Sequence, residues 1–194
     1  MLVSLLTVIP ALLMPLAAQS QIAKEKRQVD TSEPSYKYKV FAGFGYTSLN
    51  QVNQSNNGLG GPEVGITRNW GRFFGLTAFG GHYLVTFTRP NPISTTVDMF
   101  MAGPELHAPL YGPTSIFVRA TIGAVHTGGV QIQPDESLAG GGGIGMDYKL
   151  SPHLGLRAFG DDVVSSFTVQ PYQPGDSPHR RFNAHAGIGI TFEF

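Results

Sequence analysis

Charged and histidine side chains recur at alternate positions in several segments of the sequence. Asp147 and Lys149 are two residues apart, and Arg157 and Asp161 are four residues apart. In an extended strand every second side chain points to the same face, so these groups would share a face. Groups of this kind form salt bridges when they are shielded from water, and they can also act as acids or bases. We predict a network of paired charges that comprises Lys39, Glu63, Glu105, Arg119, Asp147, Arg157, Asp161, Arg181 and His185.

The residue types needed to hydrolyse an acyl ester are also present. Such catalysis needs a serine nucleophile, a histidine base and a carboxylate that orients the base. A deacylase pattern, with histidine and serine two residues apart on one strand, is absent, since His126 is followed by Thr127 and Gly128. We therefore predict no catalytic residue and no enzyme activity. The candidates that an enzyme would have to bring together are His82, His126, Asp161, Asp162, Ser165 and Ser166.

The sequence offers no pattern for a metal or a cofactor. The six histidines are scattered without the spacing of metal ligands, and the chain has no cysteine. The glycine run at 140–145 is followed by neither Lys-Ser/Thr nor a helix, so it is not a phosphate-binding loop. Because the formal net charge is zero, nothing indicates nucleic-acid binding. We predict no metal, no cofactor and no nucleic-acid partner.

The elements that would position the charged residues are β-strands. Between Arg180 and Phe194, apolar residues alternate with polar residues and glycine, which is typical of a strand with one face in an apolar medium. The alternation is less regular in two segments, where Phe79 and Phe159 fall on the polar face. Each segment is long enough for a tilted strand to cross a bilayer. Eight strands are predicted, at residues 36–49, 59–69, 72–88, 96–110, 114–129, 139–150, 153–169 and 180–194.

The connections between these segments alternate between short and long. Short turns are predicted at 69–71, 111–113 and 151–153, and longer polar segments at 51–58, 89–95, 131–137 and 171–180. Short turns on one side and long loops on the other are typical of an up-and-down antiparallel β-barrel that spans a membrane, with the short turns on the periplasmic side. An even number of strands also places both ends of the barrel on the short-turn side. We predict an all-β fold, a transmembrane barrel of eight strands.

The start of the chain indicates export. Residues 2–18 are apolar, and the small residues around Ala18 and Ser20 suit cleavage of a signal peptide. Residues 22–35 are charged and interrupted by proline. The predicted organisation is a signal peptide at 1–20, a polar tail at 21–35 and one barrel domain at 36–194.

Aromatic residues gather near the predicted strand ends, where they would form interfacial girdles. The opposite face of the strands carries charges and glycine, so both faces cannot be buried in protein. A soluble, lipocalin-like barrel, with the apolar face inward and the charges outward, is the alternative. The predicted girdle residues are Tyr36, Tyr38, Tyr46, Trp70, Phe73, Phe74, Tyr111, Tyr148, Phe192 and Phe194.

The end of the chain resembles the C-terminal signature of bacterial outer-membrane barrels. These end in an aromatic residue preceded by alternating apolar residues, here Ile188, Ile190, Phe192 and Phe194. The segment 140–167 is similar to the sixth and seventh strands of the outer membrane protein A-like barrels, although no periplasmic domain follows this barrel. The resemblance implies location in the outer membrane of a Gram-negative envelope and insertion by the assembly machinery, which would recognise the last strand. We also expect contact with outer-membrane lipid and lipopolysaccharide, and a monomer.

In an eight-stranded barrel the charges would face a space just wide enough for side chains. Arg119 and Arg157 are the predicted centres of the network, with Glu63, Glu105 and Asp161 as partners. A largely closed, salt-bridged lumen indicates a structural, anchoring or surface-interaction role. The alternatives are a small ion or solute channel in the manner of a porin, a lipid A-modifying acyl enzyme and the soluble binder.

Overall fold

The computed structural model describes residues 36–49, 57–86, 95–129, 134–165 and 181–194. The predicted signal peptide and polar tail lie outside these residues and remain predictions, as does most of each predicted long loop. None of the described residues belongs to a helix long and apolar enough to cross a membrane.

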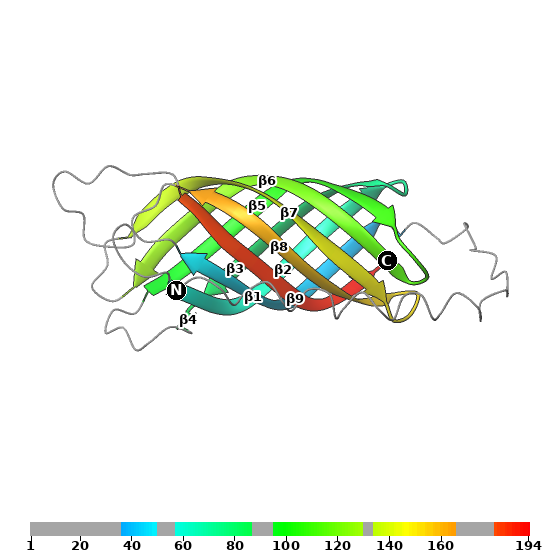
Figure 1. The fold of residues 1–194 in the computed structure, drawn as a ribbon, viewed down its shortest axis with the longest axis horizontal. Helices are drawn as coiled ribbons and strands as arrows, with labels where there is room; N and C mark the ends of the chain where they lie inside the picture. The colour runs from blue at the N-terminus through cyan, green and yellow to red at the C-terminus, as the bar shows by residue number, and fades with distance from the viewer. Residues whose placement is uncertain (1–35, 50–56, 87–94, 130–133, 166–180) are drawn as a thin grey trace, which may run out of the picture. The chain divides into compact units, whose positions relative to one another are not determined.

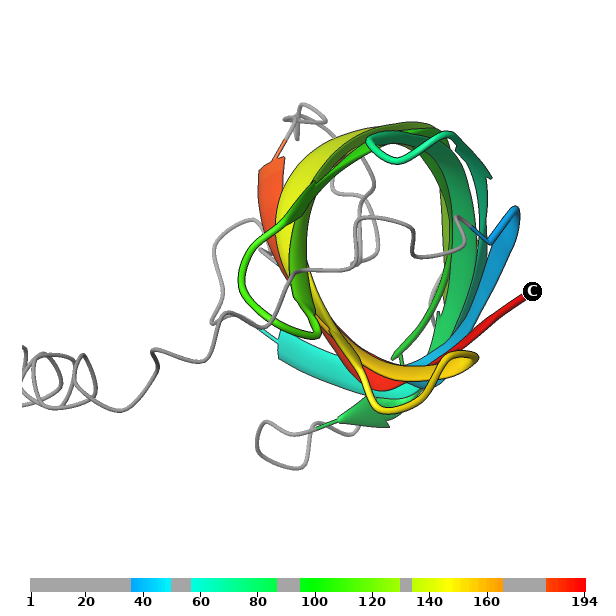
Figure 2. The same cartoon turned by 90° about the vertical axis from the view of Figure 1, so that its right-hand side faces the viewer.

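The described residues form an antiparallel sheet closed into a barrel (Figure 1). Apart from one strand of two residues, consecutive strands pair, and the first strand also pairs with the last, so the strands form a complete ring in the end-on view (Figure 2). The short β4 follows β3 and pairs with the same neighbour, β2, so the ring has eight strands. The strands are β1 (Tyr38–Leu49), β2 (Asn57–Trp70), β3 (Phe74–Tyr83), β4 (Val85–Thr86), β5 (Thr95–Pro109), β6 (Thr114–Gly129), β7 (Asp135–Lys149), β8 (Leu154–Ser165) and β9 (Arg181–Glu193).

The prediction of an eight-stranded, all-β barrel is confirmed. β7 begins earlier than predicted, because Asp135 and Glu136 pair with Thr127 and His126 of β6. These two polar residues lack the apolar alternation that marks a strand in sequence. The predicted 72–88 strand is interrupted at Leu84, between β3 and β4.

Three short connections lie at one end of the barrel, which we call the turn end. They comprise residues 71–73, 110–113 and 150–153. Gly71 and Gly112 have φ values of +74° and +58°, which explains glycine at these turns. The first turn lies two residues later than predicted, because Trp70 pairs with Phe74. The opposite end, where β1 ends and β2 begins, is the loop end.

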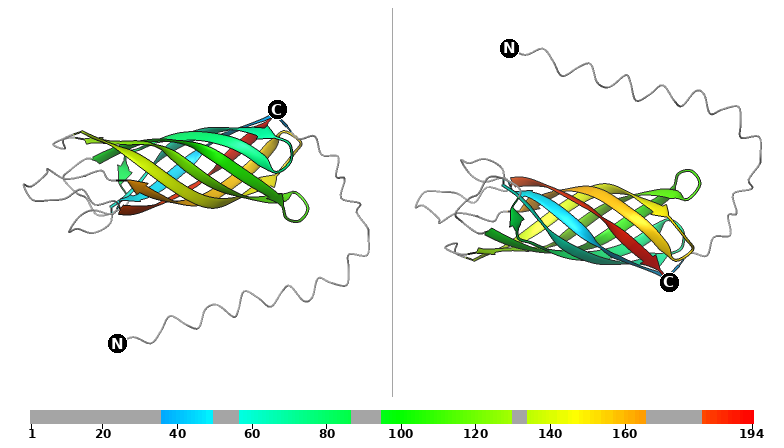
Figure 3. Two further views of the ribbon diagram at one scale, coloured as in Figure 1. Left: turned by 90° about the horizontal axis from the view of Figure 1, so that it is seen from above. Right: turned by 90° about the horizontal axis from the view of Figure 1, so that it is seen from below.

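The C-terminus also lies at the turn end (Figures 1 and 3). The backbone N–H of Glu193 donates to the carbonyl of His153 in the β7–β8 turn at 2.8 Å. The amides and carbonyls of Tyr38 and Phe194 exchange two hydrogen bonds of 2.9 Å, which close the seam between β1 and β9. The rings of these two residues stack with their centroids 5.8 Å apart.

The outer surface of the barrel is apolar. Along β8, Leu156 is 44% exposed, whereas its neighbour Arg157 is 3% exposed and faces inward. Phe100 and Ile122 are 61% and 70% exposed on the outside of β5 and β6. This arrangement is the reverse of a lipocalin-like barrel and is suited to lipid. Eight of the predicted girdle residues are exposed, namely Tyr46, Trp70, Phe73, Phe74, Tyr111, Tyr148, Phe192 and Phe194.

Candidate functional site in the barrel lumen

The alternation of the strands turns most of the predicted charge network into the lumen. Eight of its members are no more than 8% exposed, and the side chain of Arg181 lies outside the described set. Phe79 and Phe159 also face inward, at 3% and 7% exposure. The eight buried members are Lys39, Glu63, Glu105, Arg119, Asp147, Arg157, Asp161 and His185.

Arg157 is the centre of a cluster near the turn end. Its Nε and Nη2 donate to the two carboxylate oxygens of Asp147 at 2.7 and 2.9 Å. Its Nη2 and Nη1 also donate to Glu105 at 2.8 and 3.3 Å. Asp147 is directly opposite Arg157 on the neighbouring strand β7, whereas Glu105 comes from β5. The planar guanidinium group therefore joins two carboxylates across the lumen.

This turn-end cluster extends to two lysines. Lys39 Nζ lies 2.8 Å from Asp147 and 3.0 Å from Glu193. Lys149 Nζ lies 3.6 Å from Glu193, which connects β7 with the last strand. With Arg157 and Glu105, the cluster contains three cations and three carboxylates, and its formal charge is therefore zero. This balance offsets the cost of burying so many charges.

Arg119 and Asp161 form a second cluster midway along the lumen. Two nitrogens of the guanidinium donate to both carboxylate oxygens, at 2.9 and 2.5 Å. Asp161 also contacts Nδ1 of His185 at 3.0 Å. On its other side, Nε2 of His185 lies 3.1 Å from Glu63 and 3.1 Å from the hydroxyl of Tyr83. The Tyr83 hydroxyl donates to Glu63 at 3.1 Å.

His185 therefore lies between two carboxylates, with one at each ring nitrogen. If both carboxylates are ionised, both nitrogens must donate, and the ring is an imidazolium. In that form His185 and Arg119 balance the charges of Asp161 and Glu63. Oε1 of Glu63 is buried without a hydrogen-bond partner among the described residues. The mid-lumen cluster is therefore less completely hydrogen-bonded than the turn-end cluster.

Aromatic rings pack around both guanidinium groups. Cζ of Arg119 lies 4.1 Å from the ring centroid of Phe79 and 4.2 Å from that of Phe159. Cζ of Arg157 lies 4.1 Å from the ring centroid of Phe117. These are cation–π contacts in a space shielded from water, where they are stronger than at a surface. Phe79, Phe117 and Phe159 are themselves buried in the lumen beside the arginines.

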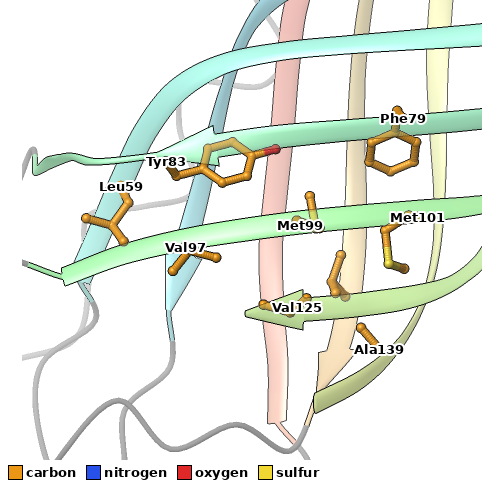
Figure 4. Packing of buried hydrophobic residues seen from close by; sticks show 9 residues of the cluster. Leu59, Phe79, Tyr83, Val97, Met99, Met101, Val125 and Ala139 are labelled. Carbon is orange, nitrogen blue, oxygen red and sulfur yellow. The ribbon is translucent and has the colours of Figure 1, made fainter. Parts of the chain in front are cut away.

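Toward the loop end one side of the lumen is apolar, whereas β1, β8 and β9 contribute the buried polar residues Thr47, Ser165 and Asn183. Figure 4 shows apolar side chains from β2, β3, β5, β6 and β7 that face the lumen and belong to one buried group. Met101 and Tyr83 are completely buried in this group. We call the group the apolar plug, and it consists of Leu59, Phe79, Tyr83, Val97, Met99, Met101, Val125, Ala139 and Val163.

The ion pairs agree only partly with the predicted partners. Glu105 and Asp161 contact Arg157 and Arg119, respectively, whereas Glu63 contacts His185 and Tyr83. Sequence reasoning did not identify Tyr83 as a member of the site, and it did not recognise the apolar plug. A signal for the plug was present, because Val97, Met99 and Met101 share the inward parity of Glu105.

The candidate catalytic residues do not converge in the described part of the barrel. His82 and His126 are half-exposed, where they pair with Asp98 and Glu136. Ser165 is 3% exposed, faces inward and accepts a hydrogen bond from Asn183 at 3.1 Å. Ser166 lies outside the described residues. The described residues contain no group of three or more His, Cys, Asp or Glu that could hold a metal.

The last strand presents its predicted assembly residues to the exterior. Ile188, Ile190, Phe192 and Phe194 are between 51% and 64% exposed. On the inner face of the same strand, His185 belongs to the mid-lumen cluster and Glu193 to the turn-end cluster. The same strand therefore contributes to the apolar belt, the charge network and the β1–β9 seam.

The closed ring, the apolar exterior and the charged lumen define an eight-stranded outer-membrane β-barrel. No family model matches the chain, and no curated protein matches it. Solved structures do match. Neisserial surface protein A is 11% identical, with a TM-score of 0.64 over 81% of this chain and 97% of that one. The outer membrane protein Ail of Yersinia pestis is 13% identical, with a TM-score of 0.50 over 82% and 99% of the two chains. This likeness confirms the predicted barrel fold, and the predicted outer-membrane location agrees with it.

Proposed function

We propose that the protein anchors its surface loops in the outer membrane and has a lumen closed to ions and solutes. The observation that carries the proposal is the filling of the lumen. The inward charges are paired in two clusters, aromatic rings flank the arginines, and the apolar plug follows toward the loop end. An ion would have to displace paired charges and then pass the side chains of the apolar plug.

Planar-bilayer recording tests the closed lumen. We expect no discrete current steps from the wild-type protein, and none from the Arg119→Ala variant, because the apolar plug and the turn-end cluster would remain. A gel comparison of unboiled and boiled samples from the same vesicles would show that both proteins are folded. Discrete steps in the wild type that change in Arg119→Ala would contradict the proposal and favour a small channel.

An anchoring role also agrees with the positions of the candidate catalytic groups. His82 and His126 face outward, whereas Ser165 faces the lumen, so the barrel wall separates the base from the nucleophile. Catalysis of acyl transfer needs these groups within hydrogen-bond reach. We therefore propose that the barrel is not an acyl enzyme, and that its partners are the surrounding lipids and lipopolysaccharide and, during assembly, the outer-membrane insertion machinery.

A further inference from the structure

Three cations lie at the turn end of β1–β3 and are exposed on the barrel surface. They are Lys37, before β1, Arg68 on β2 and Arg72 in the following turn. None of the described carboxylates forms an ion pair with them. They differ in this respect from Lys39, Lys149, Arg119 and Arg157, all of which pair with carboxylates in the lumen.

Each of these cations lies against an aromatic ring instead. Arg68 Cζ is 4.7 Å from the ring centroid of Trp70, and Arg72 Cζ is 5.5 Å from that of Phe73. Lys37 Nζ is 5.7 Å from the Tyr38 ring centroid. Trp70 and Phe73 are 44% and 57% exposed, so their rings can enter the lipid interface while the cations extend to the headgroups.

The other end of the exterior carries the opposite charge. The outward carboxylates among the described residues are Asp98, Glu136 and Asp162, and all three lie in the loop-end half of the barrel. The turn end has no outward Asp or Glu side chain among the described residues. Among the described residues, the outward cations at the turn end and the outward carboxylates near the loop end are thus separated along the barrel axis.

We propose that Lys37, Arg68 and Arg72, with Trp70 and Phe73, bind the phosphate headgroup of an anionic glycerophospholipid in the leaflet around the turn end. The guanidinium groups have free donors for phosphate oxygens, and the aromatic rings contact the upper part of the acyl chains. The missing carboxylate partners are replaced by the lipid phosphate. This interaction is separate from the lumen and does not depend on whether the lumen conducts.

Trp70 provides a direct probe, because it is the only tryptophan of the chain. The full mature protein would be refolded into phosphatidylcholine vesicles that contain increasing fractions of brominated phosphatidylglycerol, whose bromine atoms quench tryptophan fluorescence. The reciprocal series would use brominated phosphatidylcholine in phosphatidylglycerol. The two quenching curves give the relative binding constant of the lipids next to Trp70.

For the wild type we expect phosphatidylglycerol to be preferred over phosphatidylcholine by about fivefold or more, since one basic residue near an anionic surface contributes about this factor. The Arg68→Gln/Arg72→Gln variant should lose most of the preference. Glu136→Gln, a charge change at the loop end, should keep it. High salt should reduce the preference of the wild type, because salt screens the attraction between the basic residues and the anionic lipid. This measurement requires no variant.

Equal quenching by the two lipids in the wild type would overturn the proposal. An undiminished preference in a folded Arg68→Gln/Arg72→Gln protein would also overturn it, because the preference would then come from elsewhere. If that variant does not fold, the salt series decides: a wild-type preference that is unchanged in high salt would overturn the proposal.

Discussion

Arg157 illustrates how single residues stabilise the lumen. It is 3% exposed and donates four hydrogen bonds to Asp147 and Glu105, carboxylates from two different strands. A guanidinium in this position cannot be replaced by an apolar side chain of similar length without leaving two buried carboxylates short of a partner. Only Lys39 and His107 would remain near them.

Arg157→Met should therefore reduce the free energy of unfolding by about 3–5 kcal/mol, the usual cost of removing one partner of a buried ion pair. Arg72→Met, in an exposed turn, is the matched control and should change it by less than about 0.5 kcal/mol in uncharged detergent. The free energy of unfolding of both variants can be measured by urea titration. The folded fraction is read from the different gel mobilities of the folded barrel in unboiled samples and the unfolded chain in boiled samples. A loss in Arg157→Met no larger than in the control would mean that the turn-end cluster contributes nothing to stability.

At the scale of the element, β7 shows why the strands that carry the network contain so much glycine. It has consecutive glycines at 140–143 and a further glycine at 145. A Cβ at Gly143 would collide with the Asp161 carboxylate and the carbonyl of Gly160. A Cβ at Gly140 would meet no atom closer than 4.0 Å. The absence of a side chain at Gly143 therefore makes room for the Arg119–Asp161 pair, whereas Gly140 is not needed for this purpose.

Gly143→Ala should destabilise the barrel by about 1–3 kcal/mol, because the methyl group must displace Asp161 or the backbone of β8. Gly140→Ala, on the same strand, should have almost no effect. The two variants would be compared in the same urea titration. Equal stabilities would show that Asp161 moves without cost, and the pairing with Arg119 would then be looser than the described distances indicate.

The strands and their facing were predictable because a membrane barrel imposes a strict alternation. On β8, the predicted inward residue Arg157 is 3% exposed, and its neighbour Leu156 is 44% exposed. The start of β7 was not predictable, since Asp135 and Glu136 are polar and are held only by pairing with β6. The contact between Glu63 and His185 joins residues 122 positions apart, and no local pattern encodes it.

At the scale of the whole molecule, the barrel has three layers of different chemistry along its lumen and an apolar belt outside. The turn-end cluster is followed by the mid-lumen cluster around His185, which is in contact with Phe79 and Tyr83 of the apolar plug. Because the charged side chains of the two clusters lie inside, the barrel can place an apolar surface against lipid although its strands carry many charges. In such a barrel, neighbouring residues of one strand must lie in different environments, one in lipid and the next in the lumen.

Spin labelling in lipid vesicles tests this requirement most directly, because the chain has no cysteine and single cysteines can be introduced without background. On β6, Ile122 and Ala124 face outward, and Thr121 and Val125 face the lumen. Collision with oxygen, which concentrates in the lipid, should be frequent for labels at Ile122 and Ala124 and rare at Thr121 and Val125. The heat-sensitive gel shift would show that each labelled protein is folded. Collision rates without this alternation, or with the opposite phase, would contradict a lipid-embedded barrel with its charges inside.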